Sequence, residues 1–311
     1  MMLHEPPPIF ESANAVMARA LSTARRVAAS DVPVLLTGES GTGKHVLAAA
    51  IHGWSRRRAR PFVAVPHTAL TSDRHEGELI SYFEGLGKDN YGWLSAADGG
   101  TLFFEELGDL SLTQQAKLVH FLDTHRFEVG AEGAAMLIDA RVMAATARDI
   151  EADVRSGRIR EDLFFRLSVV KITLPPLRAR AEDLSNLIEH FLTNLAARHH
   201  RGEMRLTAEV RQVFARYPWP ANVRELQSVL ERVVVLSSSD TITTEDLPER
   251  LLTSLAQTPD ECTGAAGSLH ELERQHIARA IKESPTLEDA AIRLGIDPTT
   301  LWRKRKRYGL H

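Results

Sequence analysis

The sequence predicts an α/β fold in which a parallel sheet covered by helices carries a phosphate loop, followed by all-helical domains. Three observations support this class. Short runs of β-branched and other apolar residues alternate with stretches of helical periodicity up to about residue 175. A glycine-rich segment ending in lysine separates one such run from a helical stretch. Beyond residue 180 only helical patterns remain.

The composition is that of an ordinary globular protein. Among 311 residues, 43% are hydrophobic and 25% are charged, and the formal net charge of -3 gives no global attraction to nucleic acid, so any such binding must be local. A single cysteine, Cys262, excludes an intrachain disulfide framework and indicates a reducing compartment, for which the cytoplasm is the expectation. No run approaches the roughly 18 apolar residues that a membrane span needs. We expect no membrane partner and no signal peptide.

The predicted sheet begins with “VPVLLTGES” from Val32, which Gly38 stops, and the helical stretch “HVLAAAIHGWSRR” follows it. Three more apolar runs, “RPFVAV”, “TLFF” and “ARVMAAT”, alternate with helical segments such as “SLTQQAKLVHFLDTH”. This alternation is typical of a parallel sheet with helices on its faces. After “KITLPPLRAR”, residues 181–252 are predicted to form helices only. Residues 253–268 are rich in Gly, Ala, Ser and Thr and are predicted to be a linker.

The phosphate loop is the strongest single motif. The segment “GESGTGKH” lies between a predicted strand and a predicted helix, the setting in which this pattern binds phosphate. Its glycines let successive N–H groups turn inward, the helix N-terminus adds positive potential, and the lysine can reach the outer phosphates. The alternative, a glycine-rich turn without nucleotide, is disfavoured by this setting. We assign nucleotide contact to Gly38, Glu39, Ser40, Gly41, Thr42, Gly43, Lys44 and His45.

Several motifs in order resemble the AAA+ domain of bacterial enhancer-binding proteins, the NtrC-like activators of sigma-54 RNA polymerase. They are “LLTGESGTGKHVLAAAIH”, “DGGTLFFEELGDLSLTQQAKL”, “REDLFFRL”, “LPPLRAR” and “WPANVREL”. The resemblance covers about residues 7 to 250. It implies an α/β AAA+ P-loop core with a helical lid, ring formation, ATP or ADP with Mg²⁺ as cofactors, and hydrolysis used to remodel the closed polymerase complex.

The resemblance also implies roles for residues outside the loop. Glu105 falls at the metal-binding acid and Glu106 at the water-activating acid. Arg160 and Arg166 match arginines that reach into the neighbouring subunit's site, where a guanidinium group neutralises charge on the γ-phosphate. The alternative for both is a solvated or ion-paired arginine. Arg224 matches the lid arginine that senses nucleotide, with a plain helix-surface role as the alternative.

The chain departs from the family pattern on the hydrolytic side of the site. The general phosphate-loop pattern ends in a Ser or Thr that contacts magnesium directly, and this chain has His45 at that position. Glu105 stands where the family has Asp, and a displacement of about 1 Å can cost about 100-fold in rate. Pro66 replaces an Asn that restrains the catalytic Glu, and Ala147 follows Thr146 where the family has Asn after Thr. We therefore expect ATP to be bound but hydrolysed slowly or not at all.

A further departure concerns the partner. The family's sigma-54-contacting loop carries Gly-Ala-Phe-Thr-Gly-Ala, and this hexapeptide is absent from “ELISYFEGLGKDNYGWLSAADGG”, which is shorter by roughly six residues. Contact with sigma-54 is therefore not expected, although RNA polymerase stays a predicted partner. The alternative is a working ATPase that remodels sigma-54 RNA polymerase through a divergent loop at residues 80–93.

The C-terminal segment predicts three helices with one sharp turn. Thr286 can cap the second, Gly295 turns the chain, and Asp297 with Pro298 starts the third. Ala291 and Gly295 have the spacing of a helix-turn-helix. The segment resembles the Fis-type domain that closes enhancer-binding proteins, which implies a dimer on a two-fold site in double-stranded DNA. Apolar residues of the first predicted helix are Leu269, Leu272, His276, Ile277, Ala280 and Ile281.

The third predicted helix carries five consecutive cations. The alternative is a solvated charge run, but basic side chains after a helix-turn-helix start normally face phosphates and the groove. Trp302 is expected in the core. Candidates for base edges are Thr299, Thr300 and Arg303. Candidates for the DNA backbone are Lys304, Arg305, Lys306 and Arg307.

Together these features predict a DNA-binding transcription regulator with an ATP-binding module. The predicted domains are a nucleotide-binding core at 7–175, a lid at 176–252, a linker at 253–268 and a helix-turn-helix domain at 269–311. The implied homo-oligomer is a dimer or a hexameric ring. Because no receiver domain precedes residue 7, we expect regulation to come from a separate protein or from a longer chain.

Overall fold

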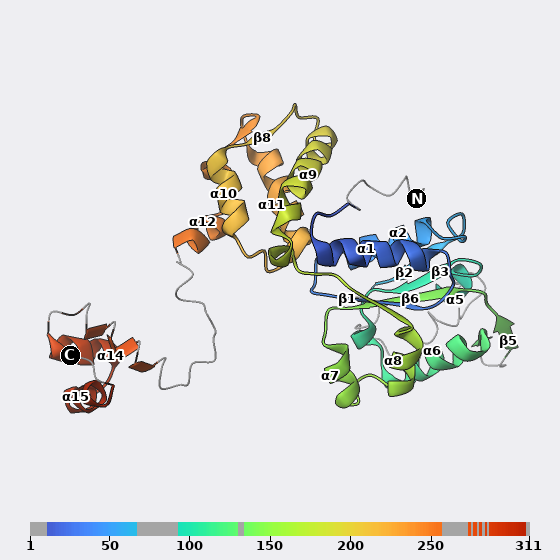
Figure 1. Ribbon diagram of the computed structural model, residues 1–311, viewed down its shortest axis with the longest axis horizontal. Helices are drawn as coiled ribbons and strands as arrows, with labels where there is room; N and C mark the ends of the chain where they lie inside the picture. Colours follow the sequence, from blue (N-terminus) through green and yellow to red (C-terminus); the bar gives the residue numbers. More distant parts are fainter. Residues whose placement is uncertain are drawn as a thin grey trace. The chain divides into compact units, whose positions relative to one another are not determined.

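The structure is a computed structural model that describes residues 11–66, 93–129, 134–256 and 273–308, apart from 275, 279, 282, 283 and 285. The chain divides into two compact units, Met1–Leu255 and Ala256–His311, which are described separately (Figure 1). The segment of the missing hexapeptide, residues 77–92, and the residues Leu269 and Leu272 lie outside the described part of the chain.

The first unit is built around a five-stranded parallel sheet, which confirms the predicted α/β class. Strand β1 lies between β6 and β7, and its last residue, Thr37, is paired in register with Thr146 on one side and Thr173 on the other. The carboxyl ends of these strands therefore meet at one edge, where open α/β sheets bind ligands. In spatial order the strands are β2 (Phe62–Val65), β3 (Thr101–Phe104), β6 (Arg141–Thr146), β1 (Val34–Thr37) and β7 (Val170–Thr173).

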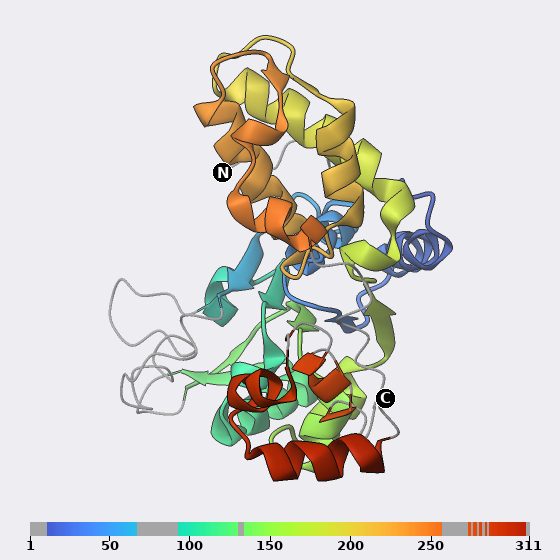
Figure 2. The ribbon, with the colours of Figure 1, turned by 90° about the vertical axis from the view of Figure 1, so that its left-hand side faces the viewer.

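Helices cover both faces of this sheet (Figures 1 and 2). Alternate strand residues such as Leu36 and Phe103 pack with α1 and α2, and Leu35 and Phe104 pack with the other face. Burial on both faces explains why the strands read as continuous apolar runs rather than as alternating patterns. The covering helices are α1 (Ala15–Ala28), α2 (Lys44–Gly53), α5 (Trp93–Ala96), α6 (Leu112–Thr124), α7 (Ile150–Arg155) and α8 (Glu161–Leu167).

A β-hairpin connects α6 to strand β6 of the sheet, and it was not predicted from the sequence. Its strands, β4 (Arg126–Val129) and β5 (Ala134–Leu137), pair antiparallel. The short 3₁₀ helix η2 (Leu107–Asp109) follows β3 and is capped by the Glu106 side chain. The carboxylate expected to activate water therefore lies where the sheet ends and a tight turn begins.

The remainder of the first unit is a helical lid with its own apolar core. The prediction of helices only was wrong at one point, because β8 (Arg205–Leu206) and β9 (Thr241–Ile242) form a short parallel pair. Two-residue strands carry no readable periodicity. The lid helices are α9 (Leu184–Arg198), α10 (Ala208–Arg216), α11 (Asn222–Leu236) and α12 (Glu249–Ala256), with 3₁₀ turns η3 (Leu177–Ala179), η4 (Ala181–Asp183) and η5 (Thr244–Asp246).

The second unit contains a helix-turn-helix formed by α14 (Leu287–Leu294) and α15 (Pro298–Arg307). The predicted signals are present: the Thr286 side chain caps α14, Gly295 takes a left-handed conformation with φ of 64°, and Asp297 caps α15. Its small core is made by Ile277, Ala290, Ala291 and Leu301.

Candidate nucleotide-binding site

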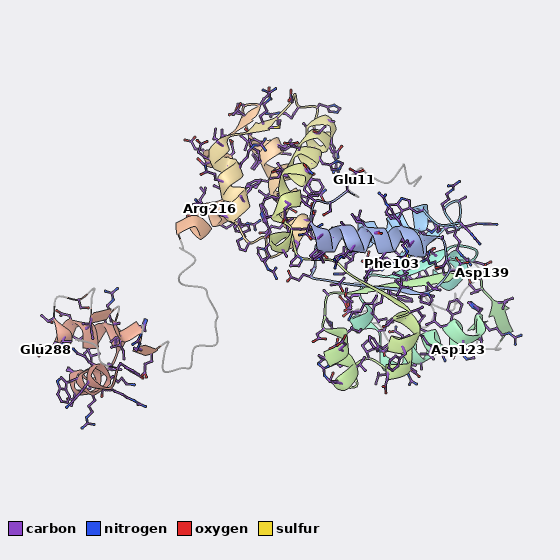
Figure 3. All side chains as sticks on the ribbon, in the orientation of Figure 1. Glu11, Phe103, Asp123, Asp139, Arg216 and Glu288 are labelled. Carbon is purple, nitrogen blue, oxygen red and sulfur yellow. The ribbon has the colours of Figure 1, made fainter. Side chains whose placement is uncertain are left out.

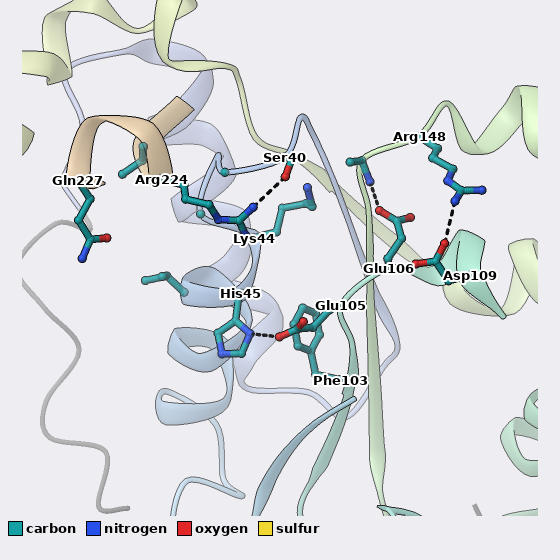
Figure 4. A pocket seen from close by; sticks show the side chains of 15 residues that line it. Ser40, Lys44, His45, Phe103, Glu105, Glu106, Asp109, Arg148, Arg224 and Gln227 are labelled. Carbon is teal, nitrogen blue, oxygen red and sulfur yellow. Dashed lines mark hydrogen bonds and ion pairs between the residues drawn. The ribbon is translucent and has the colours of Figure 1, made fainter. Parts of the chain in front are cut away.

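A cavity of about 600 Å³ opens at the carboxyl edge of the parallel sheet (Figure 4). Its walls come from the loop after β1, the start of α2, the end of β3, the end of β6 and the start of α11. It therefore lies where strand β1 is followed by the N-terminus of helix α2, the position that binds phosphates in such sheets. Of the predicted residues, the cavity is lined by Ser40, Gly41, Gly43, Lys44, His45, Glu105, Glu106 and Arg224.

The phosphate loop needs its glycines for two separate reasons. Gly38, Gly41 and Gly43 have φ values of 144°, 78° and 105°, a region that other residues rarely adopt. In addition, a Cβ on Gly41 would lie 2.1 Å from the Ala221 carbonyl oxygen, so the lid approaches the loop too closely for any side chain. Burial lowers the pKa of Lys44, whose ammonium group donates to the carbonyls of Gly38 and Glu39 at 2.6 and 3.0 Å.

Glu39, which is predicted to contact nucleotide, connects the loop to the lid side of the unit through its carboxylate. Its carboxylate pairs with Arg178 at 2.8 and 2.5 Å and accepts from the Asn222 amide at 3.2 Å. These hydrogen bonds, that of Arg178 first, lower the pKa of Glu39 to about 2. Asn222 also donates to the Ser40 carbonyl at 2.9 Å and accepts from Leu177 N–H at 2.7 Å.

We call the contacts that hold the phosphate loop against the lid side the clamp. Three of its residues, Arg178, Arg180 and Asn222, were assigned no role in the sequence analysis. Arg178 and Arg180 stand in “LPPLRAR” and Asn222 in “WPANVREL”, stretches used only to establish a resemblance. Arg180 is buried and donates to the Thr42 carbonyl at 3.0 Å. Asn222 is buried with φ of 55°, a left-handed conformation that asparagine tolerates better than most residues. The presence of an asparagine at a helix start was the available signal.

Glu105 and His45 form a contact at the metal end of the cavity. The His45 Nδ1 atom lies 2.8 Å from a carboxylate oxygen of Glu105. The imidazole also meets Phe103 and Phe62 edge-on, with ring centroids 5.7 and 6.0 Å away. Its side chain is 53% exposed, so the ring is oriented by packing and still reachable from solvent.

Glu106 is held by the strand next to it in the sheet. The Ala147 N–H donates to its carboxylate at 2.8 Å, and the buried Thr146 hydroxyl donates to the other oxygen. These hydrogen bonds to Glu106 could not be predicted from the family pattern, in which an asparagine side chain restrains the catalytic glutamate. Here the donors are a threonine hydroxyl and a backbone N–H. Pro66, which follows β2, cannot supply a side-chain hydrogen bond.

The three predicted arginines differ in position. Arg224 lines the cavity, where its guanidinium donates to the Ser40 hydroxyl at 3.0 Å and its N–H to the Gly41 carbonyl at 3.3 Å. Arg160 lies outside the cavity and pairs with Asp162 at 2.8 Å. Arg166 also lies outside and pairs with Asp123 on α6, labelled in Figure 3.

The predicted DNA-contacting residues of α15 differ in solvent exposure and form two sets. Thr299, Arg303, Lys306 and Arg307 are exposed, whereas Thr300, Lys304 and Arg305 are half-buried. Lys304 forms an ion pair with Glu273, to which the Tyr308 hydroxyl also donates at 2.5 Å. The prediction that Trp302 is core was wrong: it is 56% exposed, because Leu301 takes the core position one residue earlier, and Lys306 lies 5.4 Å from its ring.

The fold and this cavity define a nucleotide-site protein of the P-loop class joined to a helix-turn-helix unit. Comparison with protein families makes the class specific: residues 10–173 match the sigma-54 interaction domain, 178–263 the AAA+ ATPase lid domain, and 268–308 the bacterial regulatory protein, Fis family. The chain belongs to the family of sigma-54-type enhancer-binding transcriptional regulators, with an AAA+ module and a DNA-binding domain.

Individual relatives agree with this assignment. The chain is 42% identical over 305 residues to the alginate biosynthesis transcriptional regulatory protein AlgB of Pseudomonas aeruginosa, covering 97% of this chain and 68% of AlgB. It is 37% identical over 298 residues to ZraR of Salmonella typhimurium, covering 94% and 67%. Among solved structures, NtrX from Brucella abortus in complex with ADP matches with a TM-score of 0.71 and 27% identity over 97% of this chain and 69% of NtrX.

No described helix is long and apolar enough to cross a membrane. Within the same residues, no group of three or more His, Cys, Asp or Glu side chains is placed to hold a metal ion.

Proposed function

We propose that this regulator binds ATP and ADP firmly, hydrolyses ATP slowly, and uses nucleotide to control its assembly on DNA. One observation carries the proposal: the phosphate side of the cavity is complete, while the hydrolytic side is altered. The loop glycines and Lys44 retain the geometry for phosphate, and Glu106 is tied to β6 through Thr146 and Ala147. The NtrX structures in complex with ADP and with ATP support nucleotide binding in this fold.

Each side chain then has a defined part. Loop N–H groups and Lys44 would hold the phosphates, and Arg224 would report their presence to the lid. A divalent cation, Mg²⁺ by the family pattern, would neutralise phosphate charge next to Glu105. The Glu105 carboxylate suits Mg²⁺, but the neighbouring His45 imidazole is a donor that Mg²⁺ rarely takes.

Action on polymerase is proposed to proceed without sigma-54 remodelling. The sequence lacks the hexapeptide that touches sigma-54 in the family, so a stable sigma-54 complex is not expected. Co-migration of this chain with sigma-54 in the presence of an ATP transition-state analogue would contradict the proposal. Transcriptional effects would instead arise through polymerase with another sigma factor, or through occlusion of a promoter.

The alternative function is an active ATPase that remodels sigma-54 polymerase through a divergent loop. It is favoured by the retention of Glu106 and of both arginines proposed to act in a neighbouring site, Arg160 and Arg166. Both guanidinium groups lie on the surface, each 43% exposed, where a second copy could meet them.

DNA binding is proposed to use the exposed face of α15. Thr299, Trp302, Arg303 and Lys306 recur at the three- and four-residue spacing that places side chains on one helix face. Lys304 is directed to Glu273 and is removed from the candidate set. A dimer of these units would place two such helices on a two-fold site.

Nucleotide affinity and turnover, measured at rising protein concentration, test the nucleotide proposal. We expect clear binding with turnover far below the roughly 10 per second that is typical of enzymes. Lys44→Ala should abolish binding, because the loop loses its only cation, whereas Lys171→Ala, on β7 and paired with Glu151, should not. If Lys44→Ala bound nucleotide with unchanged affinity, the assignment of the phosphate loop would be wrong. ATP turnover near about 10 per second would favour the alternative function, an active ATPase.

A further inference from the structure

We propose that His45 and Glu105 together coordinate the divalent cation of the nucleotide site, and that this site prefers first-row transition cations to Mg²⁺. The inference rests on the proposed nucleotide binding and deepens it by naming the class of metal. Mn²⁺ and Co²⁺ are the practical probes of that class.

The two side chains occupy the positions that meet a nucleotide's metal. His45 directly follows Lys44 in the first turn of α2, where phosphate loops normally carry a hydroxyl for the cation. Glu105 directly follows β3 at the carboxyl edge of the sheet. Both line the same cavity, and Figure 4 draws their side chains pointing toward each other, with a dashed line between them.

Their separation suits a shared cation. The His45 Nδ1 atom and the Glu105 Oε1 atom lie 2.8 Å apart. If both atoms stood about 2.1 Å from one cation, a separation of this size would subtend about 84° there, close to the ~90° between neighbouring ligands of an octahedral ion. The imidazole would coordinate through the Nδ1 lone pair, with its proton on Nε2.

The surroundings of His45 hold its ring in place for this role. Phe103 and Phe62 contact it edge-on, at interplanar angles of 78° and 87°. These aromatic rings limit the directions in which the imidazole can turn, while half of its side-chain surface stays open to solvent. Such packing orients a ligand in advance, which reduces the ordering cost of binding.

The chemistry of the donor pair decides the metal. Mg²⁺ is a hard ion that takes oxygen ligands, whereas imidazole nitrogen is a common ligand for transition metals. Affinity of a mixed nitrogen and oxygen site rises from Mn²⁺ to Co²⁺. The contact joins one imidazole and one carboxylate, and two donors hold a cation weakly, so phosphate oxygens and water would complete the coordination and firm metal binding should require nucleotide.

The first test is equilibrium binding of a fluorescent non-hydrolysable ATP analogue to the full chain with Mg²⁺, Mn²⁺, Co²⁺ or EDTA. Affinity should rise in the order Mg²⁺, Mn²⁺, Co²⁺. His45→Ser, which supplies a hydroxyl, should lower the ratio of Co²⁺ to Mg²⁺ affinity by about tenfold. His120→Ser is the matched control, because His120 is exposed on α6 and outside the cavity. Comparing ratios cancels the intrinsic preference of the nucleotide for each metal.

The second test detects the bond itself. Pulsed electron paramagnetic resonance of Mn²⁺ should show coupling to an imidazole nitrogen when the analogue is present, and His45→Ser should abolish it while His120→Ser keeps it. Equal metal ratios in wild type and His45→Ser, or no nitrogen coupling, would overturn the inference. So would a uniform gain with every metal in His45→Ser, since the imidazole would then be blocking the cation. Failure of the wild type to bind nucleotide with any metal would instead overturn the proposed function.

Discussion

At the scale of single residues, the site depends on how neighbouring strand ends constrain its carboxylates. Glu106 receives a hydrogen bond from the Thr146 hydroxyl and another from the Ala147 N–H. Because β3 and β6 are neighbours in the sheet, these donors stand beside the carboxylate without any loop to position them. A carboxylate held in this way is less free to turn toward an attacking water.

We predict that Thr146→Val raises steady-state ATP turnover by up to about tenfold and leaves nucleotide affinity unchanged. Valine keeps the volume and branching that suit a buried strand but removes the donor, and a hydrogen bond to a charged group contributes about 1.5–3 kcal/mol. Thr173→Val, at the end of strand β7, is the control, since its hydroxyl contacts Thr37 and not Glu106. Turnover that falls in Thr146→Val would show that the threonine positions Glu106 for catalysis rather than restrains it.

Single site residues could be predicted from the sequence where a motif specifies both the residue types and their spacing. The loop from Gly38 to Lys44 and the adjacent acids follow such patterns, and the structure brings Lys44, Glu105 and Glu106 to one cavity. The clamp of Arg178 and Asn222 on Glu39 could not be predicted, because it joins positions 139 and 183 residues apart in the chain. Hydrogen bonds of that range depend on how the lid meets the core.

At the scale of elements, α15 shows how a run of cations is divided by helix geometry. Residues three and four apart share a face, so Arg303 and Lys306 face solvent with Trp302, while Lys304 turns to Glu273 inside the unit. Five consecutive basic residues therefore do not present five equivalent charges. The start and the turn of this motif could be predicted from Thr286 and Gly295. The core position of Trp302 was predicted wrongly, because residues 301 and 302 are both apolar and only packing selects one of them for the core.

We predict that Lys306→Ala weakens binding to specific and random duplexes alike and flattens the salt dependence of affinity, because a phosphate contact carries no base information. The matched control is Lys304→Ala, which should leave the salt slope unchanged since its ammonium group is paired with Glu273. Arg303→Ala should cost about 1–3 kcal/mol mainly on the specific duplex. Binding measured across a salt series checks all three, and equal slopes for both lysine variants would refute the assignment of faces.

We predict that Trp302 contacts the 5-methyl group of a thymine in the major groove. Its exposed ring lies on the same face as Arg303, and apolar side chains read that methyl group. Replacing thymine by uracil throughout a selected site should weaken wild-type binding about fourfold per methyl group buried. Trp302→Ala should bind the two duplexes equally. A variant that still discriminates between thymine and uracil would place the methyl contact on another side chain.

At the scale of the whole molecule, DNA affinity should come from the second unit, although the chain as a whole carries a net charge of -3. If a dimer places Arg305, Lys306 and Arg307 of each subunit on about six phosphates, log affinity should fall against log salt with a slope of about -5. Removal of residues 269–311 should abolish that affinity. The succession of sheet, lid and C-terminal helices could be predicted from the sequence, because each part has its own pattern of apolar residues. Strands β8 and β9 could not be predicted, because they form through contacts between distant segments.

The last prediction concerns assembly, because Arg160 and Arg166 do not line the cavity of their own chain. If they act in a neighbouring site, a chain lacking both arginines and a chain carrying Lys44→Ala should each be inactive alone. Mixed, they should recover part of the wild-type turnover, since the Lys44→Ala subunit supplies arginines to the intact phosphate loop of the other. As a control, the variant lacking both arginines must bind nucleotide with wild-type affinity. Its loss of turnover can then be assigned to the missing arginines and not to a damaged nucleotide site. Turnover measured over a range of mixing ratios gives the result, and a mixture no more active than its components would mean that these arginines serve their own chain through Asp162 and Asp123.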